Sequence, residues 1–485
     1  GGLAFVTTII IARVLGPEVY GDYAFLLGTF VGVMSLLNLG TSSAFQTFMS
    51  QKERGKMFVI SYAGWQLLLI LFSILVIGVI LPEKWLNKIW LGHDRGLVLL
   101  AFVAVFMQRQ AWRTVVQIGE SMRLTYRVQI LNISIAAVHF VLVIGFWIGE
   151  MLSVRLIFGL FLVEYVIFLV VACNVLSVFN LEGETFEGRD VLREYVKYCS
   201  PLVLYSIVGF GYQFADRWML QNFGGSRQQG LYEAGFRFGM VSLLITASLL
   251  NIFWKEIAEA KEKENSELMQ KLYRKASRFL FWLGAVLVGF LVPWSEVIIR
   301  LMLGPSYAEG ASVLAIMLLV SVFASLAQIN GSMLLASGKT RAHFAFGSIF
   351  MGVSIPCSYF ILASKDAFLS GLELGSLGLA AKMLVFVILH VNIVSWWISR
   401  DRGWKFDWTY QVFALAGALG SGWLSFELVE ALSSYISVNL FFKGGLMLLL
   451  YGGVVGVMTW QMPWVAGTSR QGIKSYYFRF INLRF

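Results

Sequence analysis

About fourteen apolar stretches follow one another along almost the whole chain, and most of them are long enough to cross a lipid bilayer. A membrane-spanning helix needs roughly 20 mostly apolar residues, because the hydrocarbon core of a bilayer is about 30 Å thick. Backbone polar groups inside a bilayer must bond to one another, which only helices and closed barrels allow. Stretches of this length predict an all-α polytopic membrane protein with about 14 transmembrane helices.

The amino-acid composition excludes an ordinary soluble domain. Hydrophobic residues make up 58% of the chain and charged residues only 14%, whereas about 25% of the residues in soluble domains are charged. The mean hydropathy is +0.74. A soluble fold of this length could not bury that much apolar surface.

The expected spans fall into two halves of the chain. The first seven cover residues 1–14, 23–45, 58–81, 97–118, 128–148, 156–179 and 201–223. The other seven cover residues 231–253, 279–302, 311–336, 344–363, 377–398, 410–428 and 438–460. The first stretch is short and the chain begins with Gly1, so we expect that the start of helix one is missing from this sequence.

The distribution of lysine and arginine predicts the orientation of the chain. Most of these residues outside the spans fall on loops of one side, among them the loops at residues 52–56 and 255–278. Short cytoplasmic loops are enriched in lysine and arginine. Both termini are therefore expected in the cytoplasm, and the net charge of +10 indicates contact with anionic lipid headgroups rather than nucleic-acid binding.

An internal repeat organises the spans. The turn LGPEVYGDYA at 15–24 corresponds to FGGSRQQGLYEA at 223–234, since both are bounded by glycine and contain Gly-x-Tyr. Likewise Trp-Leu-Gly at 90–92 corresponds to Met-Leu-Gly at 302–304. An offset of six spans keeps both copies in the same orientation, which predicts two parallel six-helix repeats plus two C-terminal helices.

The repeat also predicts the domain organisation. Residues 1–180 would form an N-terminal six-helix lobe and residues 198–405 a second one, joined by a cytoplasmic linker at 181–197. Residues 406–465 would form the two additional helices. The tail at 466–485 alternates basic and aromatic residues, a pattern typical of an interfacial anchor.

The chain resembles a known family, the polysaccharide transporters or Wzx-type oligosaccharide (O-antigen) flippases of the multidrug/oligosaccharidyl-lipid/polysaccharide exporter superfamily. The resemblance covers essentially the whole chain. Three motifs carry it: ARVLGPEVYG at 12–21, Ala-Asp-Arg at 215–217, and LGPSYAEGA at 303–311. The second copy of the first turn has Gly225-Ser226-Arg227 where Gly-Pro-Glu would be expected.

The resemblance implies a flippase that carries a polyprenyl-diphosphate-linked oligosaccharide across the bacterial inner membrane by alternating access. A diphosphate in a low-dielectric cavity needs cationic partners, and arginine offers planar, multi-donor pairing. The fourth span contains Arg109, Arg113 and Gln117 at intervals of four residues, which places them on one helix face. We expect Arg109 and Arg113 to line a cationic cavity, and Gln117 to be a polar cavity or ion-coupling residue.

Charged residues in the later spans are further candidates. Gln213, Asp216 and Arg217 fall within one turn of span seven. We expect Arg217 to face the cavity, Asp216 to meet a stabilising or ion-coupling partner, and Gln213 to be a polar cavity or ion-coupling residue. Glu233 and Arg237 are four residues apart, so they either pair with each other or line the cavity.

Two further charged residues lie inside apolar stretches. Lys382 in span twelve is either another cavity cation or a side chain that reaches the headgroups. Glu164 in span six is interpreted as a lone buried carboxylate, which either exchanges a coupling ion or is simply hydrogen-bonded. His139 is interpreted as a helix-packing residue rather than a metal ligand.

Two other classes of function have to be weighed. A multidrug or metabolite antiporter of the same superfamily would share the core, but its cavity would be expected to be acidic, and two extra helices fit it poorly. A membrane glycosyltransferase or glycan polymerase would need a sizeable outer loop, which the short loops here disfavour. A flippase for the peptidoglycan precursor would fit the fold equally well and differ only in its cargo.

No cofactor, metal or catalytic residue is predicted. The segment Ser-Gly-Lys-Thr at 337–340 ends like a phosphate-binding loop, but Met333 stands where the first glycine of that motif is required. Transport would then be driven by a proton or sodium gradient, by the membrane potential or by consumption of the product. The expected partners are the lipid-linked oligosaccharide and membrane lipids, and the resemblance leaves open a glycan polymerase or chain-length machinery.

Overall fold

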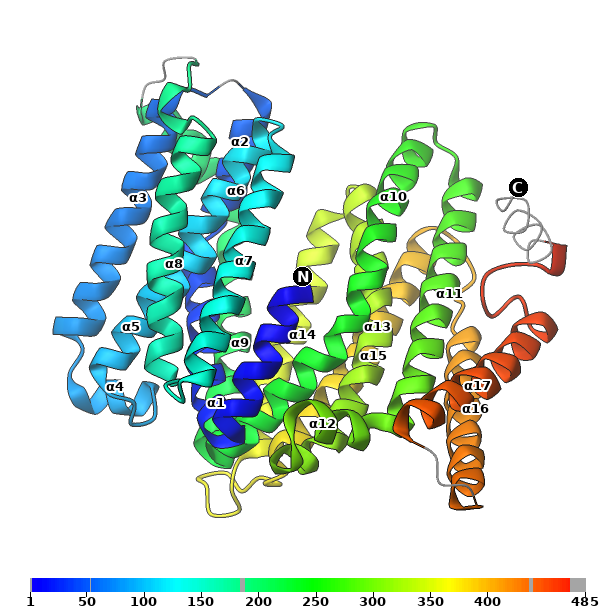
Figure 1. Ribbon diagram of the computed structural model, residues 1–485. Coiled ribbons are helices and arrows are strands. Elements are labelled where there is room, and N and C mark those ends of the chain that lie inside the picture. Colours follow the sequence, from blue (N-terminus) through cyan, green and yellow to red (C-terminus); the bar gives the residue numbers. More distant parts are fainter. Residues whose placement is uncertain (1, 53, 184–187, 436–438, 472–485) are drawn as a thin grey trace. The chain divides into compact units, whose positions relative to one another are not determined.

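The computed structural model describes residues 2–52, 54–183, 188–435 and 439–471. Within these ranges the chain forms helices joined by short segments, with no β-strand (Figure 1), which confirms the predicted all-α class. The first helices are α1 (Gly2–Asn38), α2 (Thr41–Gln51), α3 (Lys56–Leu75), α4 (Glu83–Ile89), α5 (Arg95–Phe106), α6 (Trp112–Ser121), α7 (Thr125–Ile148), α8 (Val154–Val175) and α9 (Gly188–Gly239). The later ones are α10 (Leu243–Glu262), α11 (Ser266–Leu291), α12 (Ser295–Leu303), α13 (Ala311–Ala336), α14 (Thr340–Leu362), α15 (Gly375–Asp401), α16 (Thr409–Tyr435) and α17 (Leu440–Gln461).

Short helical segments of other types continue several of these helices. Two are π-helices, η1 (Val76–Ile80) after α3 and η2 (Met107–Ala111) between α5 and α6. The four 3₁₀ segments are η3 (Val178–Asn180), η4 (Met240–Ser242), η5 (Val292–Trp294) and η6 (Pro305–Gly310). Each predicted span coincides with helical residues, and among the described residues 10 helices are long and apolar enough to cross a membrane by themselves.

Two of the helices, α1 and α9, each run through parts of two predicted spans. A single glycine with non-helical backbone angles marks the break between the spans in each helix. Gly16 has φ 71° and ψ 169° within α1, and Gly225 has φ 74° and ψ 175° within α9. Only glycine adopts this backbone region without strain. The two glycines stand at equivalent positions of the predicted repeats, and their matching geometry supports the repeat.

The chain divides into two compact units. Unit 1 comprises residues Gly1–Leu231 and Met351–Ser376, and unit 2 comprises Tyr232–Phe350 and Leu377–Phe485. The lobes at 1–180 and 198–405 remain a prediction, since they follow the repeat and not compactness. Residues 188–197 of the predicted linker belong to α9, and the tail lies outside the described residues from position 472 onward.

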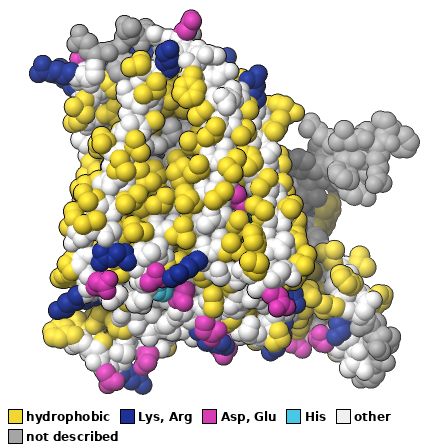
Figure 2. Space-filling view, turned by 60° about the vertical axis from the view of Figure 1, so that its left-hand side comes forward, with side chains coloured by type: hydrophobic (Ala, Val, Ile, Leu, Met, Phe, Trp, Pro, Cys, Tyr) yellow, Lys and Arg dark blue, Asp and Glu magenta, His cyan; other side chains and the backbone are white. Residues whose placement is uncertain are grey.

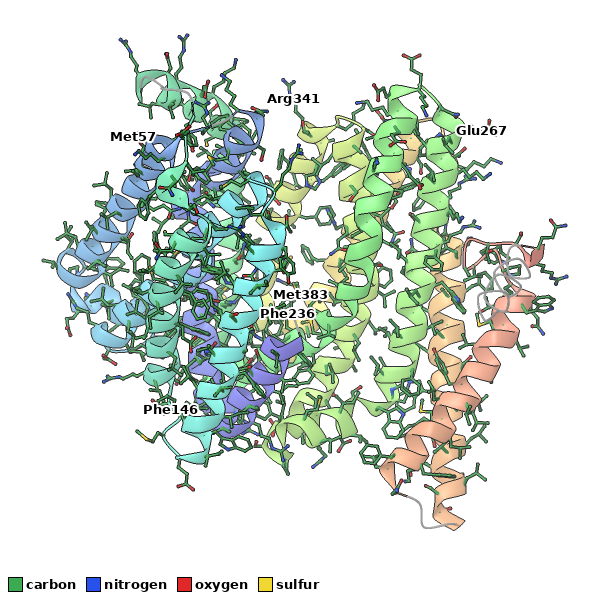
Figure 3. The ribbon with its side chains drawn as sticks, turned by 45° about the horizontal axis from the view of Figure 1, so that its top comes forward. Met57, Phe146, Phe236, Glu267, Arg341 and Met383 are labelled. Atoms are coloured by element: carbon green, nitrogen blue, oxygen red, sulfur yellow. The ribbon has the colours of Figure 1, made fainter. Side chains whose placement is uncertain are left out.

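In unit 1, α1 packs against α5 and α7, while α8 packs against α5 and α7. The short helix α2 contacts α6. A cluster of buried side chains that includes Phe45, Phe58, Trp112 and Leu131 joins α2, α3, α6 and α7. In Figure 3, Met57 at the start of α3 and Phe146 near the end of α7 lie at opposite ends of the unit.

In unit 2, α11 packs against α10, α13 and α16, and α17 packs against α16. Polar side chains connect three of its helices, because the Tyr273 hydroxyl donates to Asn330 Oδ1 over 2.7 Å and Asn330 Nδ2 donates to Ser395 Oγ over 3.0 Å. Glu267 at the start of α11 and Arg341 at the start of α14 lie at one end of the unit (Figure 3).

The surface of the helices is apolar over most of their length. Figure 2 shows a broad belt of hydrophobic side chains, with the charged side chains gathered toward its two ends. On α3, Leu68 is 63% exposed and Phe72 is 62% exposed. Exposed apolar patches of a soluble monomer rarely exceed a few hundred Å². A belt of this extent therefore identifies a multi-pass membrane protein.

Candidate functional site

The turns at the two repeat-equivalent glycines fit into each other within unit 1. A Cβ atom placed on Gly21 would stand 1.8 Å from the carbonyl oxygen of Ser226. A Cβ on Gly230 would stand 2.0 Å from the carbonyl oxygen of Pro17. We call Pro17, Gly21, Ser226 and Gly230 the glycine interlock; it is symmetric, since Gly21 and Pro17 occupy the same repeat positions as Gly230 and Ser226.

Ionic and polar contacts surround the interlock. Arg227 Nη1 donates to Glu18 Oε1 over 2.9 Å, and this hydrogen bond holds the pKa of the Glu18 carboxyl below its usual value. Asp22 Oδ1 accepts hydrogen bonds from Ser226 Oγ and from Gln221 Nε2. Arg227 stands where the Gly-Pro-Glu pattern would have a glutamate. An acidic residue at position 227 would repel Glu18, whereas Arg227 attracts it.

Arg217 lies across the backbone of α1. A Cβ atom on Gly28 would stand 2.0 Å from Arg217 Nε, so the guanidinium occupies the space that a side chain at position 28 would fill. Its Nη1 donates to the Gln213 carbonyl over 3.3 Å, and its buried Nε has no hydrogen-bond partner among the described residues. A buried donor without a partner is costly, which makes Arg217 a candidate for binding an anion.

The neighbouring Asp216 faces a different helix. It is 7% exposed, and Ser358 of α14 donates a short hydrogen bond to its Oδ1. Adjacent residues on a helix point about 100° apart, so Asp216 and Arg217 have separate partners. The structure thus gives Asp216 a partner of the stabilising kind, while an ion-coupling role for it stays a prediction.

The predicted stripe on span four is divided by the π-helix η2. Arg109 in η2 and Arg113 in α6 are exposed on unit 1. Gln117, by contrast, is 2% exposed and donates from Nε2 to Ser42 Oγ over 2.9 Å, which ties α6 to α2. Gln117 is enclosed by helix packing, and a π-helix turns at a different rate from an α-helix, so Arg109, Arg113 and Gln117 do not share one exposed face. A cavity-lining role for Arg109 and Arg113 stays a prediction.

Glu164 is not a lone carboxylate. Its Oε2 lies 2.9 Å and its Oε1 3.1 Å from Nδ1 of His139, which comes from α7. Glu164 is 3% exposed and His139 is 9% exposed. The histidine ring also stacks on Phe161, with 4.7 Å between the ring centroids. The interpretation of Glu164 as isolated was therefore wrong, since a histidine 25 residues earlier in the sequence is its partner.

The remaining predicted residues belong to unit 2. Arg237 Nε donates to Glu233 Oε1 over 2.7 Å, so the pair that the helical spacing allows is formed. Glu233 Oε2 is buried and has no hydrogen-bond partner among the described residues. Lys382 is 3% exposed, and its Nζ lies 6.0 Å from the centroid of the Phe386 ring. Whether Lys382 is a cavity cation or reaches the headgroups stays a prediction.

Sequence reasoning missed the residues that hold the candidates in place. Gly28, Ser358 and His139 were not among the predicted site residues, although each sets the position of one that was. One signal was present: Gly21, Gly28 and Gly32 recur at intervals of seven and four, which marks a small-residue helix face. The partners from other helices left no such signal, because nothing in the local pattern links them.

Comparison with protein families gives two matches. Residues 1–254, more than half of the chain, match the family described as polysaccharide biosynthesis protein. Residues 201–360 match the MatE family. None of the curated proteins matches the sequence.

Comparison with solved structures gives the same fold. The chain is similar to the lipid II flippase MurJ in an inward closed conformation, with a TM-score of 0.70, 13% identity, and coverage of 95% of this chain and 97% of that one. It is also similar to a multidrug resistance MATE family transporter of the MOP superfamily in its inward-facing conformation, with a TM-score of 0.60, 15% identity, and coverage of 83% and 95%. For the outward-facing conformation of a MATE family transporter the TM-score is 0.52 and the identity 15%, with coverage of 83% of this chain and 92% of that one. At such low identity these likenesses establish the fold, two six-helix repeats with additional C-terminal helices.

Proposed function

Because the chain belongs to the polysaccharide biosynthesis protein family of the multidrug/oligosaccharidyl-lipid/polysaccharide superfamily, we propose that it is a flippase for a polyprenyl-diphosphate-linked oligosaccharide. The cargo would be the repeat unit of a surface polysaccharide such as O-antigen, and the membrane would be the bacterial inner membrane with both termini in the cytoplasm. The lipid II flippase, a protein of the same fold, supports a cargo made of lipid and sugar.

Arg217 is the observation that carries this proposal. Its guanidinium lies over a glycine, its Nε is buried without a hydrogen-bond partner among the described residues, and the adjacent Asp216 is engaged by Ser358. A guanidinium with an unused buried donor favours binding an anion that has several acceptor oxygens. The diphosphate of the lipid carrier has that chemistry, and Arg109 and Arg113 add positive charge on another helix of unit 1.

The glycine interlock supplies a way to close the transport path. At its two contacts the backbones of α1 and α9 are so close that there is no room for a Cβ atom at Gly21 or Gly230. Packed interfaces of this kind have discrete arrangements, and alternating access needs a gate with two such states. We assign the engaged state seen here to a closed gate on the side opposite the basic loops.

A multidrug antiporter is the second candidate, favoured by the likeness to the MATE transporter in its inward-facing conformation. The match to the lipid II flippase covers 95% of this chain and the match to the MATE transporter covers 83%. The wider match supports the flippase.

Translocation of a labelled polyprenyl-diphosphate oligosaccharide in proteoliposomes tests the proposal. We expect flipping by the intact protein and a loss of roughly tenfold or more in Arg217→Ala, the size expected for a hydrogen bond to a charged group. Arg127→Ala removes an exposed arginine that is none of the predicted site residues and whose Nη1 donates to the Val175 carbonyl, and this variant should flip normally. An intact protein that flips no lipid-linked glycan but exports organic cations would overturn the proposal in favour of the antiporter.

A further inference from the structure

Unit 1 has an apolar groove that none of the predicted transport residues line. Its walls are formed by Phe58, Tyr62 and Trp65 of α3 and by Val191, Leu192 and Val196 of α9. The volume of this apolar groove is about 510 Å³, within the range of pockets that hold small ligands. Trp65 is 45% exposed, Leu192 65% and Val196 60%, so the groove is open along its length.

A second hollow of about 400 Å³, the basic pocket, is lined by residues from the same turns of α9. Lys52, Arg54 and Lys197 contribute positive charge to its lining, and Glu194 contributes the carboxylate. Glu53 stands beside Lys52 in the sequence and lies outside the described residues. The described charges of the basic pocket therefore favour an anion.

Arg54 connects the two hollows. Its side chain is only 6% exposed, its Nη2 donates to Glu194 Oε2 over 2.9 Å, and its Nε has no hydrogen-bond partner among the described residues. The guanidinium carbon lies 5.0 Å from the centroid of Phe58, which lines the apolar groove. A buried cation is thus held where an apolar wall meets a basic pocket.

We propose that the apolar groove and the basic pocket together bind an anionic phospholipid, with the phosphate in the pocket and an acyl chain in the groove. A free anion would use only the pocket, and a neutral lipid would gain nothing from the lysines. The loop between α2 and α3 lies on the side that the distribution of lysine and arginine assigns to the cytoplasm, where anionic lipids concentrate. This site shares no lining residue with the predicted transport residues, Arg217 among them, and does not depend on the cargo.

Trp65 provides a reporter for the test. The full-length protein is reconstituted in phosphatidylcholine nanodiscs, and phosphatidylglycerol with brominated chains, which quench tryptophan fluorescence, is titrated in. The signal of Trp65 is the part of the quenching that the Trp65→Phe variant lacks. We expect half-quenching at a several-fold lower mole fraction of brominated phosphatidylglycerol than of brominated phosphatidylcholine.

Matched variants assign the preference to the pocket. Lys52 and Lys197 are exposed, so a Lys52→Gln/Lys197→Gln double variant should fold normally. It should lose the several-fold preference, since each basic residue near an anionic surface contributes about a factor of five in affinity. The control Lys56→Gln/Arg193→Gln removes two exposed charges nearby that do not line the pocket, and it should keep the preference.

Three results would overturn the proposal. Equal quenching by both lipids in the unaltered protein would show that the groove takes any acyl chain. A preference that persists in the Lys52→Gln/Lys197→Gln variant would place the recognition elsewhere. Displacement of the brominated lipid by soluble glycerol phosphate would show that the pocket recognises a phosphate group without its lipid.

Discussion

At the scale of the residue, the position of the Arg217 side chain depends on the absence of a side chain at Gly28 of α1. Its side chain lies across Gly28, where even a methyl group would collide with Nε. The colliding atoms belong to a flexible side chain, so a larger residue at position 28 would displace the guanidinium without breaking the backbone packing.

The first prediction follows from that contact. Gly28→Ala should reduce flipping about as much as Arg217→Ala, while the melting temperature changes little. Gly32→Ala is the matched control, because a Cβ there would be 3.6 Å from its nearest neighbour, Gln213, an ordinary contact. Unchanged flipping in Gly28→Ala would mean that the position of Arg217 is unimportant.

The buried pair of His139 and Glu164 gives a second prediction. Glu164→Leu leaves a buried ring nitrogen without a partner, which costs about 1–3 kcal/mol, whereas replacing both partners by apolar residues is nearly neutral. Thermal unfolding should therefore show that Glu164→Leu is less stable than the His139→Leu/Glu164→Leu double variant. If both are equally stable but Glu164→Gln no longer flips along a proton gradient, the pair is a coupling site and not a structural one.

These residue contacts mark the limit of prediction from sequence. Arg217 was predicted as a cationic candidate because a charge inside an apolar stretch is expensive. Its partner Gly28, the Ser358 that bonds Asp216 and the His139 that bonds Glu164 come from other helices. Which residue faces which depends on how the helices pack in three dimensions, and hydropathy does not contain that information.

At the scale of the element, the predicted spans match the helices because their lengths follow bilayer thickness. What hydropathy could not give is the internal geometry. The breaks at Gly16 and Gly225 occupy one residue each, so α1 and α9 each run through what was expected to be a turn. The π-helix η2 has no hydropathy signature, yet it changes which residues of span four share a face.

The glycine interlock gives a third prediction. In Gly21→Ala the added methyl group meets the backbone carbonyl of Ser226, which cannot rotate away. Overpacking of this kind costs about 1–3 kcal/mol, enough to shift a two-state gate by roughly tenfold or more. A cysteine placed at the buried Ala24 should then react faster with a water-soluble maleimide. Gly64→Ala, with open space around it, should leave the rate unchanged; an unchanged rate in Gly21→Ala would argue against the gate.

The ion pair beside the interlock gives a fourth prediction. Arg227→Glu should lower the melting temperature slightly, and adding Glu18→Arg should restore it, with a coupling energy of about 0.2–1 kcal/mol for such exposed groups. The pKa of Glu18 is lowered in the folded protein, so its contribution is complete above the unfolded value near 4.5 and is lost as the pH falls through the folded one. Coupling that persists in a Glu18→Gln background, where position 18 carries no charge, would exclude the ion pair as its source.

At the scale of the whole molecule, the charge distribution predicts which loops share a side. In a variant without its three cysteines, a single cysteine at Arg123 or Lys263 should be protected from an impermeant maleimide in intact cells. A cysteine at Glu150 or Asp366 should be labelled, because those loops fall on the side with few lysines and arginines. Labelling of both pairs alike would contradict the predicted orientation.

The pairing of Glu18 with Arg227 has a consequence for the history of the chain. The two residues stand at the same position of the two repeats, so in a parent with identical halves they would have been one residue meeting its own copy across a symmetry axis. A residue cannot neutralise its own charge. The attraction therefore depends on a difference between the halves at this position, and exchanging one half for a copy of the other would remove it.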